Sequence, residues 1–241
     1  MKLSSVIATV IGLSVVPVTA KAAVDFSGSL GALAANVSFD VLPGSQLKVS
    51  LTNTSASQAL VPSSVLTGVF FNGLNGLTPV SAHLNTGSVV VNASQNDGPY
   101  VGLQPPGGNV GGEWAYESGF GGPNSTTAGI SSTGLGLFGQ FNFNGPNLQD
   151  PTALDGMQYG IVPASNADGI GNGGMGGNAF IRNSVVFVLS NYTGGVAGLA
   201  NISNVQFQYG TNLSEPRFGG GTPTCANGSP NFPTCGTNQE V

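Results

Sequence analysis

Apolar residues at every second position are the feature that most limits how this chain can fold. They alternate with polar or small residues over residues 33–41, which is the period of a strand with one buried face. After the turn sequence Pro43-Gly44-Ser45 the alternation resumes over residues 47–51, with Lys48 and Ser50 directed to the opposite face. This pattern predicts a β-hairpin with one buried and one hydrated face. No segment beyond residue 22 shows a sustained helical period, so we expect little helix.

Other apolar runs predict further strands at 65–71, 89–91, 113–116, 184–189 and 205–209. The run from Val185 to Leu189 is apolar throughout, so we expect this strand to be covered on both faces. Residues 95–178 carry long loops, of which 168–178 is especially rich in glycine. Short strands joined by turns rich in Gly, Asn and Pro are typical of a sandwich or barrel. We therefore predict an all-β fold, an antiparallel β-sandwich that is jelly-roll-like and has long Gly-rich loops.

Residues 1–22 have the parts of a secretory signal peptide. Lys2 is followed by an apolar run over residues 6–18, and Ala20 and Ala22 supply small residues at the −3 and −1 positions. The run is shorter than the roughly 20 apolar residues that a membrane span needs. We predict cleavage after Ala22, export by the general secretory route and a β-sandwich domain over residues 23–217.

From residue 218 onward the composition changes to Gly, Pro, Asn and Thr, which predicts a flexible tail over residues 218–241. Cys225 and Cys235 are the two cysteines of the chain. An isolated pair in an oxidising compartment usually forms a disulfide, so we expect a local bridge that does not brace the sandwich. The tail has no apolar stretch, so we expect no transmembrane anchor after leader cleavage and release from the cell.

The charge balance excludes several classes of partner. After cleavage the chain would carry Lys48, Arg182 and Arg217 against ten acidic residues. So few basic groups cannot neutralise many phosphates, which argues against nucleic acid, and an anionic lipid surface would repel the chain. Uncharged polar residues (Asn, Ser, Thr and Gln) must therefore form most of the solvent-exposed surface, which suits a cell exterior rich in polysaccharide.

The residues that could support catalysis do not form a recognisable centre. His83 is the single histidine and lies in an ordinary strand pattern, without a nucleophile-elbow motif nearby. Glu113 and Glu117 would lie about 13 Å apart on one strand, farther than the two acids of a glycosidase. One histidine and a tail cysteine pair do not make a zinc site. We predict no catalytic residues, no metal and no cofactor.

Two features leave alternatives open. Trp114 and Tyr116 would share one face of a strand, where they stack on sugar rings if exposed and form core if buried. The loop 168–178 offers oxygen donors at Asp168, Asn172 and Asn178, but it lacks the regular acidic spacing of known calcium loops. It is either a flexible loop or a calcium site.

Six stretches, in order along the chain, resemble a known family. They are VLTGVFF (65–71), GGEWAY (111–116), GISSTGLGLFG (129–139), GPNLQ (145–149), DGMQYGI (155–161) and ISNVQFQYGT (202–211). Together they resemble exosortase-dependent surface proteins, exported bacterial proteins with PEP-CTERM sorting tails. The resemblance covers about residues 30–216.

The resemblance implies export, sorting by an exosortase and a place at the cell surface or in extracellular matrix, with no known enzymatic activity. Members of that family typically end in a Pro-Glu-Pro motif, an apolar span and a basic cluster, which residues 218–241 lack. The leading hypothesis is a non-enzymatic exported surface or matrix protein whose partners are extracellular polysaccharide or surface proteins. A carbohydrate-binding module is the second hypothesis and a secreted hydrolase the third.

Overall fold

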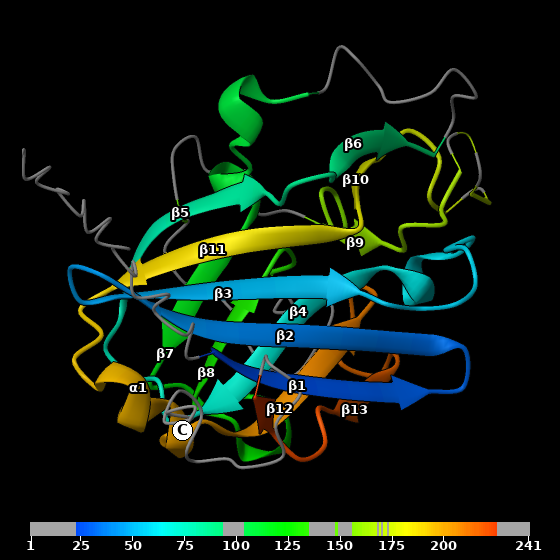
Figure 1. Cartoon of the computed structure of the whole chain (residues 1–241). Helices are drawn as coiled ribbons and strands as arrows, with labels where there is room; N and C mark the ends of the chain where they lie inside the picture. The colour runs from blue at the N-terminus through cyan, green and yellow to red at the C-terminus, as the bar shows by residue number, and fades with distance from the viewer. Residues whose placement is uncertain are drawn as a thin grey trace, which may run out of the picture.

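The computed structural model describes residues 23–93, 104–134, 148, 156–167, 169, 171–172 and 174–225. Two β-sheets pack face to face, and their strands cross at a steep angle (Figure 1). The chain changes sheet repeatedly after its first three strands, so the predicted all-β sandwich is confirmed. The predicted signal peptide, residues 1–22, lies outside the described residues.

The first sheet has six strands in the order β14-β1-β2-β3-β11-β5. All its ladders are antiparallel, and β2 and β3 form the predicted hairpin with Phe39 opposite Val49. Alternate side chains point into the sandwich and are buried, while Lys48 and Ser50 lie on the outer face. The strands are β1 (Ala23–Leu30), β2 (Leu33–Leu42), β3 (Gln46–Asn53), β5 (Thr78–Leu84), β11 (Ser184–Ser190) and β14 (Thr224–Cys225).

The second sheet has eight strands and branches at its centre. One side of β4 pairs with β12, while the other pairs with β8 along most of its length and with β9 at Leu66. The ladder between β9 and β10 is parallel, so this sheet is mixed. Its strands are β4 (Leu66–Asn72), β6 (Val89–Asn92), β7 (Ala115–Ser118), β8 (Ala128–Ser131), β9 (Ile161–Val162), β10 (Ala179–Arg182), β12 (Ser203–Tyr209) and β13 (Arg217–Gly219).

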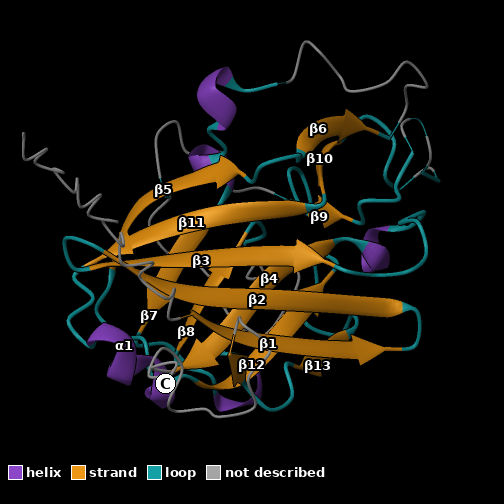
Figure 2. Ribbon diagram, in the orientation of Figure 1, coloured by secondary structure: helices purple, strands orange, loops and turns teal. Residues whose placement is uncertain are grey.

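Helical segments in the described part of the chain are single turns between strands (Figure 2). They are η1 (Pro62–Ser64), η3 (Pro106–Gly108), η4 (Gly111–Glu113), η5 (Pro123–Ser125), α1 (Gly195–Gly198) and η6 (Leu199–Asn201). Within the described ranges, none of the helices has the length and hydropathy to cross a bilayer. The expectation of little helix holds for these residues.

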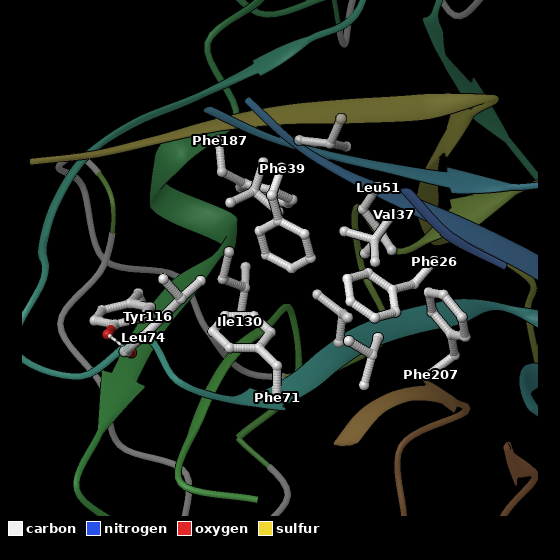
Figure 3. Close-up of a cluster of buried hydrophobic side chains, with 14 of the residues drawn as sticks. Phe26, Val37, Phe39, Leu51, Phe71, Leu74, Tyr116, Ile130, Phe187 and Phe207 are labelled. Atoms are coloured by element: carbon white, nitrogen blue, oxygen red, sulfur yellow. Dashed lines mark hydrogen bonds between the residues drawn. The ribbon is translucent and has the colours of Figure 1, made fainter. Parts of the chain in front are cut away.

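Aromatic side chains from both sheets meet in the space between them (Figure 3). The Phe39 ring lies edge-on to Phe26 of its own sheet and to Phe71 of the opposite sheet, with centroids 6.0 and 5.4 Å apart. Such edge-to-face pairs add to the stabilisation that comes from burying apolar area. Phe39 therefore joins the two sheets at the centre of the core.

Strand β4 is covered on both faces, whereas β11, for which the apolar run predicted this, is not. Leu66 to Phe71 are all buried, because β4 lies at the centre of its sheet and Phe70 also packs on the outer side against Ala115. In β11, Val186 and Val188 point to the outer face and are only half-buried. An unbroken apolar run therefore does not identify the doubly covered strand in this chain.

The sandwich extends past the boundary predicted at residue 218. Phe218 lies in β13 and packs against Phe207 and Tyr209, and Cys225 in β14 pairs with Val24 of β1. Because β13 crosses directly under β1, a Cβ on Gly28 would lie 2.1 Å from the backbone oxygen of Gly219. The prediction of a tail from residue 218 is therefore wrong for residues 218–225, which close one edge of the sandwich.

Candidate functional site

The aromatic pair predicted as a sugar platform is core instead. Trp114 is fully buried and its ring lies 5.0 Å from that of Phe187, centroid to centroid. The Tyr116 hydroxyl donates a 2.8 Å hydrogen bond to the Leu74 carbonyl oxygen, and burial raises the pKa of Tyr116. Both side chains point between the sheets, so neither can stack on a sugar ring. The core alternative is correct for both residues.

The two glutamates near this strand lie in different places. The prediction that they share one strand is wrong, because η4 ends at Glu113 and β7 begins at Ala115. Glu113 lines a pocket with Pro105 and Tyr159, whereas Glu117 lines a second pocket with Leu77, Tyr116 and Ser118. This arrangement separates the two carboxyl groups that a glycosidase would need on either side of one bond.

The Glu113–Tyr159 pocket is the clearest candidate site in the described structure. Its volume is about 320 Å³, and it combines one carboxylate, one phenol and one amide with apolar walls. Small-molecule sites are typically concave and mainly apolar with a few well-placed polar groups. Its lining residues are Pro105, Pro106, Asn109, Val110, Gly112, Glu113 and Tyr159.

Strand β5 holds one wall of this pocket in place. Asn109 forms an isolated bridge with His83, and the Val110 amide donates a 2.9 Å hydrogen bond to the Ala82 carbonyl oxygen. The Gly111 amide donates to the Asn109 side-chain Oδ1 at 2.8 Å, so the Nδ2 group of Asn109 can donate to a ligand. His83 thus supports the backbone beside the pocket and is not itself part of the lining.

Tyr159 forms the opposite wall and has an unusual backbone. Its φ is 55°, in the left-handed region that bulky residues rarely adopt. The Tyr159 amide donates a 2.8 Å hydrogen bond to Ala179 of β10, and the Gly160 amide donates to the Met157 carbonyl oxygen at 2.9 Å. Burial raises the pKa of the Tyr159 phenol, and the negative charge of Glu113 raises it further. The carboxylate and the phenol therefore act on each other in the pocket.

The loop 168–178 is described only in part, since Asp168 lies outside the described residues. The Asn172 side-chain oxygen accepts a hydrogen bond from the Gly174 amide, and the Asn178 side-chain nitrogen donates to the Met175 carbonyl oxygen. Among the described residues, no group of His, Cys, Asp and Glu could hold a metal ion. The calcium alternative is untested and stays open.

Cys225 is buried in β14, while Cys235 lies outside the described residues. Their pairing stays a prediction. Intact mass before and after reduction tests it, because the disulfide form is lighter by two hydrogens.

No family model, no curated protein and no solved structure matches this chain. The candidate site therefore stands on its own geometry. Sequence reasoning considered Glu113 but missed Asn109, four residues before it in the same loop, and Tyr159, which the fold brings beside it from a later loop. Tyr159 lies in the stretch DGMQYGI, which contributes to the family resemblance but has no sequence feature that indicates a binding site.

Proposed function

We propose that this chain is an exported, non-enzymatic protein of the cell surface or extracellular matrix. The observation that carries the proposal is the outer face of the six-stranded sheet. On this face Ser27, Asn36 and Thr52 form one cross-strand row, and the next row contains Ser38 and Ser50. These short side chains present hydroxyl and amide groups on a regular surface.

Such a surface favours hydroxyl-rich partners over charged ones. In the same two rows the titratable side chains are Asp25 and His83. The second row also contains Thr224, opposite Asp25, and the apolar Val186, between Ser50 and His83. The row beside it holds Asp40 and Lys48, which neutralise each other across a 2.8 Å ion pair. Polysaccharide and the polar faces of other surface proteins are the partners that this face suits.

Cell fractionation tests the proposed location. The full chain is expressed in a bacterium that has an exosortase and in the same strain without one. We expect processed protein that begins at Ala23 in the medium or in the wash fraction of both strains. Protein that keeps residues 1–22 in the cytoplasm would contradict export, and release that depends on the exosortase would contradict free secretion.

A second candidate function is carbohydrate binding. Burial of Trp114 and Tyr116 removes its original site, but the Glu113–Tyr159 pocket supports it independently because it places an aromatic ring beside hydrogen-bonding groups. A glycan array probed with the purified mature protein tests this function. Reproducible binding to one class of glycan supports it, and no binding to any glycan contradicts it.

A further inference from the structure

We infer that the Glu113–Tyr159 pocket binds one neutral pyranose unit of an extracellular polysaccharide. This inference rests on the second proposed function, carbohydrate binding, and gives it a location and a ligand class. The described lining of this site includes neither Trp114 nor Tyr116.

The size of the pocket limits the ligand. Its volume of about 320 Å³ is at the lower end of the range for small-molecule sites, roughly 300–1,000 Å³. A single sugar ring is a suitable occupant, whereas a longer oligosaccharide would have to extend out of the pocket. We therefore expect recognition of one unit, with the rest of the polymer in solvent.

The chemistry of the walls matches the two kinds of surface on a pyranose. The Tyr159 ring and the rings of Pro105 and Pro106 offer apolar area for the C–H face of the sugar. A carboxylate has about four lone-pair sites, so Glu113 can accept from sugar hydroxyls in addition to its protein partners. Asn109 can donate through Nδ2.

Charge narrows the ligand class further. Among its described lining residues the pocket has one carboxylate and no basic side chain, so none of them would pair with the carboxylate of a uronic acid. Quaternary ammonium groups are bound by cages of several aromatic rings, and Tyr159 is the one aromatic side chain among the described lining residues. A neutral sugar fits both observations.

The pocket is preorganised by the backbone of Tyr159. A non-glycine residue with a φ of 55° has a strained backbone, and this conformation persists where surrounding contacts require it. Here those contacts are two hydrogen bonds, one from the Tyr159 amide to the Ala179 carbonyl oxygen and one from the Gly160 amide to the Met157 carbonyl oxygen. A ring that is already positioned loses little entropy when a ligand binds.

The test uses the purified mature protein and methyl glycosides of glucose, galactose and mannose, with glucuronic acid and choline as contrasting probes. Binding is measured by saturation-transfer NMR and calorimetry. We expect one neutral glycoside to bind with a Kd of about 1 mM, and glucuronic acid and choline to bind at least about tenfold more weakly.

Three variants locate the site. Glu113→Ala removes the acceptor, and Tyr159→Gly removes the ring while relieving the positive φ, which offsets part of the packing that the ring makes against the core. Both should weaken binding at least about tenfold, with the wild-type circular dichroism spectrum retained. Glu117→Ala, the matched control in a different pocket, should bind like the wild type.

The outcomes separate the inference from the function on which it rests. If the wild type binds no glycan on the array and no methyl glycoside, the pocket assignment and the carbohydrate-binding function are both overturned. If it binds glycans and both pocket variants bind equally well, the pocket is overturned and carbohydrate binding stands. Preference for glucuronic acid or choline, lost in the variants, would overturn the neutral ligand class alone.

Discussion

The hairpins β1–β3 and the strands β12–β14 meet at one edge of the sandwich, yet they are specified in different ways. The hairpins join sequence neighbours through long, regular ladders, with Ala23 opposite Asp40 and Leu42 opposite Gln46. In contrast, β13 and β14 are two or three residues long, and β14 pairs with β1 from the other end of the described chain. Local alternation determines the hairpins, whereas close backbone approach and burial determine the closing strands.

The largest effect is expected at Phe39, where the core joins the two sheets. Phe39→Ala removes the contacts with Phe26 and Phe71 and leaves a cavity, so we expect a loss of about 3–5 kcal/mol in the free energy of unfolding. Urea denaturation measures it. The exposed control Val80→Ala should change stability by no more than about 0.5 kcal/mol. A loss below about 1 kcal/mol at Phe39 would mean that the sheets do not depend on this contact.

Gly28→Ala tests the closing edge. The new methyl group would collide with the Gly219 carbonyl oxygen, so β13 has to move and we expect a loss of about 1–3 kcal/mol. Gly121→Ala is the matched control, because nothing lies within 4 Å of the added carbon. Equal urea midpoints for the two variants would contradict the close approach of β1 and β13.

Alkaline pH should weaken the contact between Tyr209 and the end of the hairpins. The Tyr209 hydroxyl donates a 2.8 Å hydrogen bond to the Ala34 carbonyl oxygen, and burial raises the pKa of Tyr209 far above its ordinary value of 10.0. The folded state therefore favours the neutral phenol. The resulting stability is complete below pH 10.0 and falls as the pH rises above it.

Thermal melts between neutral pH and alkaline pH measure this dependence. Tyr209→Phe should lower the free energy of unfolding by about 1 kcal/mol at neutral pH. The stability of this variant should then fall less steeply than that of the wild type as the pH rises. Some decline should remain, because burial also raises the pKa of Tyr116 and Tyr192. An alkaline profile identical to that of the wild type would exclude Tyr209 as a source of the effect.

The smallest effect is expected within the hairpins, at the ion pair of Lys48 and Asp40. The Lys48 side chain is 24% exposed, so water screens the pair, and the buried Asp40 side chain keeps a further interaction when Lys48 is replaced. Lys48→Met should therefore cost about 0.5–1 kcal/mol. The loss should shrink in high salt. A loss as large as that at Phe39 would show that the outer face matters as much as the core.

Sequence reasoning was most successful where contacts are local. The alternation over residues 33–51 predicted β2, β3 and the direction of Lys48, because period-two burial leaves a direct trace in the sequence. It was wrong for β11 and for residues 218–225, where burial depends on what lies across the sandwich. Phe218 is buried because Phe207 and Tyr209 cover it, and nothing in its own Gly-rich segment indicates this.

The candidate site was harder to predict for the same reason. The sequence places Trp114 and Tyr116 on one face of a strand. Whether that face is exposed to solvent depends on Phe187 and Leu74, which are distant from the pair in the sequence. Glu113 and Tyr159 meet only after β5 and β10 have positioned their loops. Local patterns therefore identified Glu113 as a candidate, but not the Tyr159 and Asn109 side chains with which it lines the pocket.

The pairing of β1 with β14 has a consequence for the order of events as the chain is made. Val24 is among the first residues of the sandwich to emerge, and its partner Cys225 is among the last. The hairpins can form early, but their open edge must wait for almost the whole domain to appear. Contacts of such long sequence separation slow folding, so an incompletely synthesised chain keeps this edge of the sandwich open until β14 is available to pair.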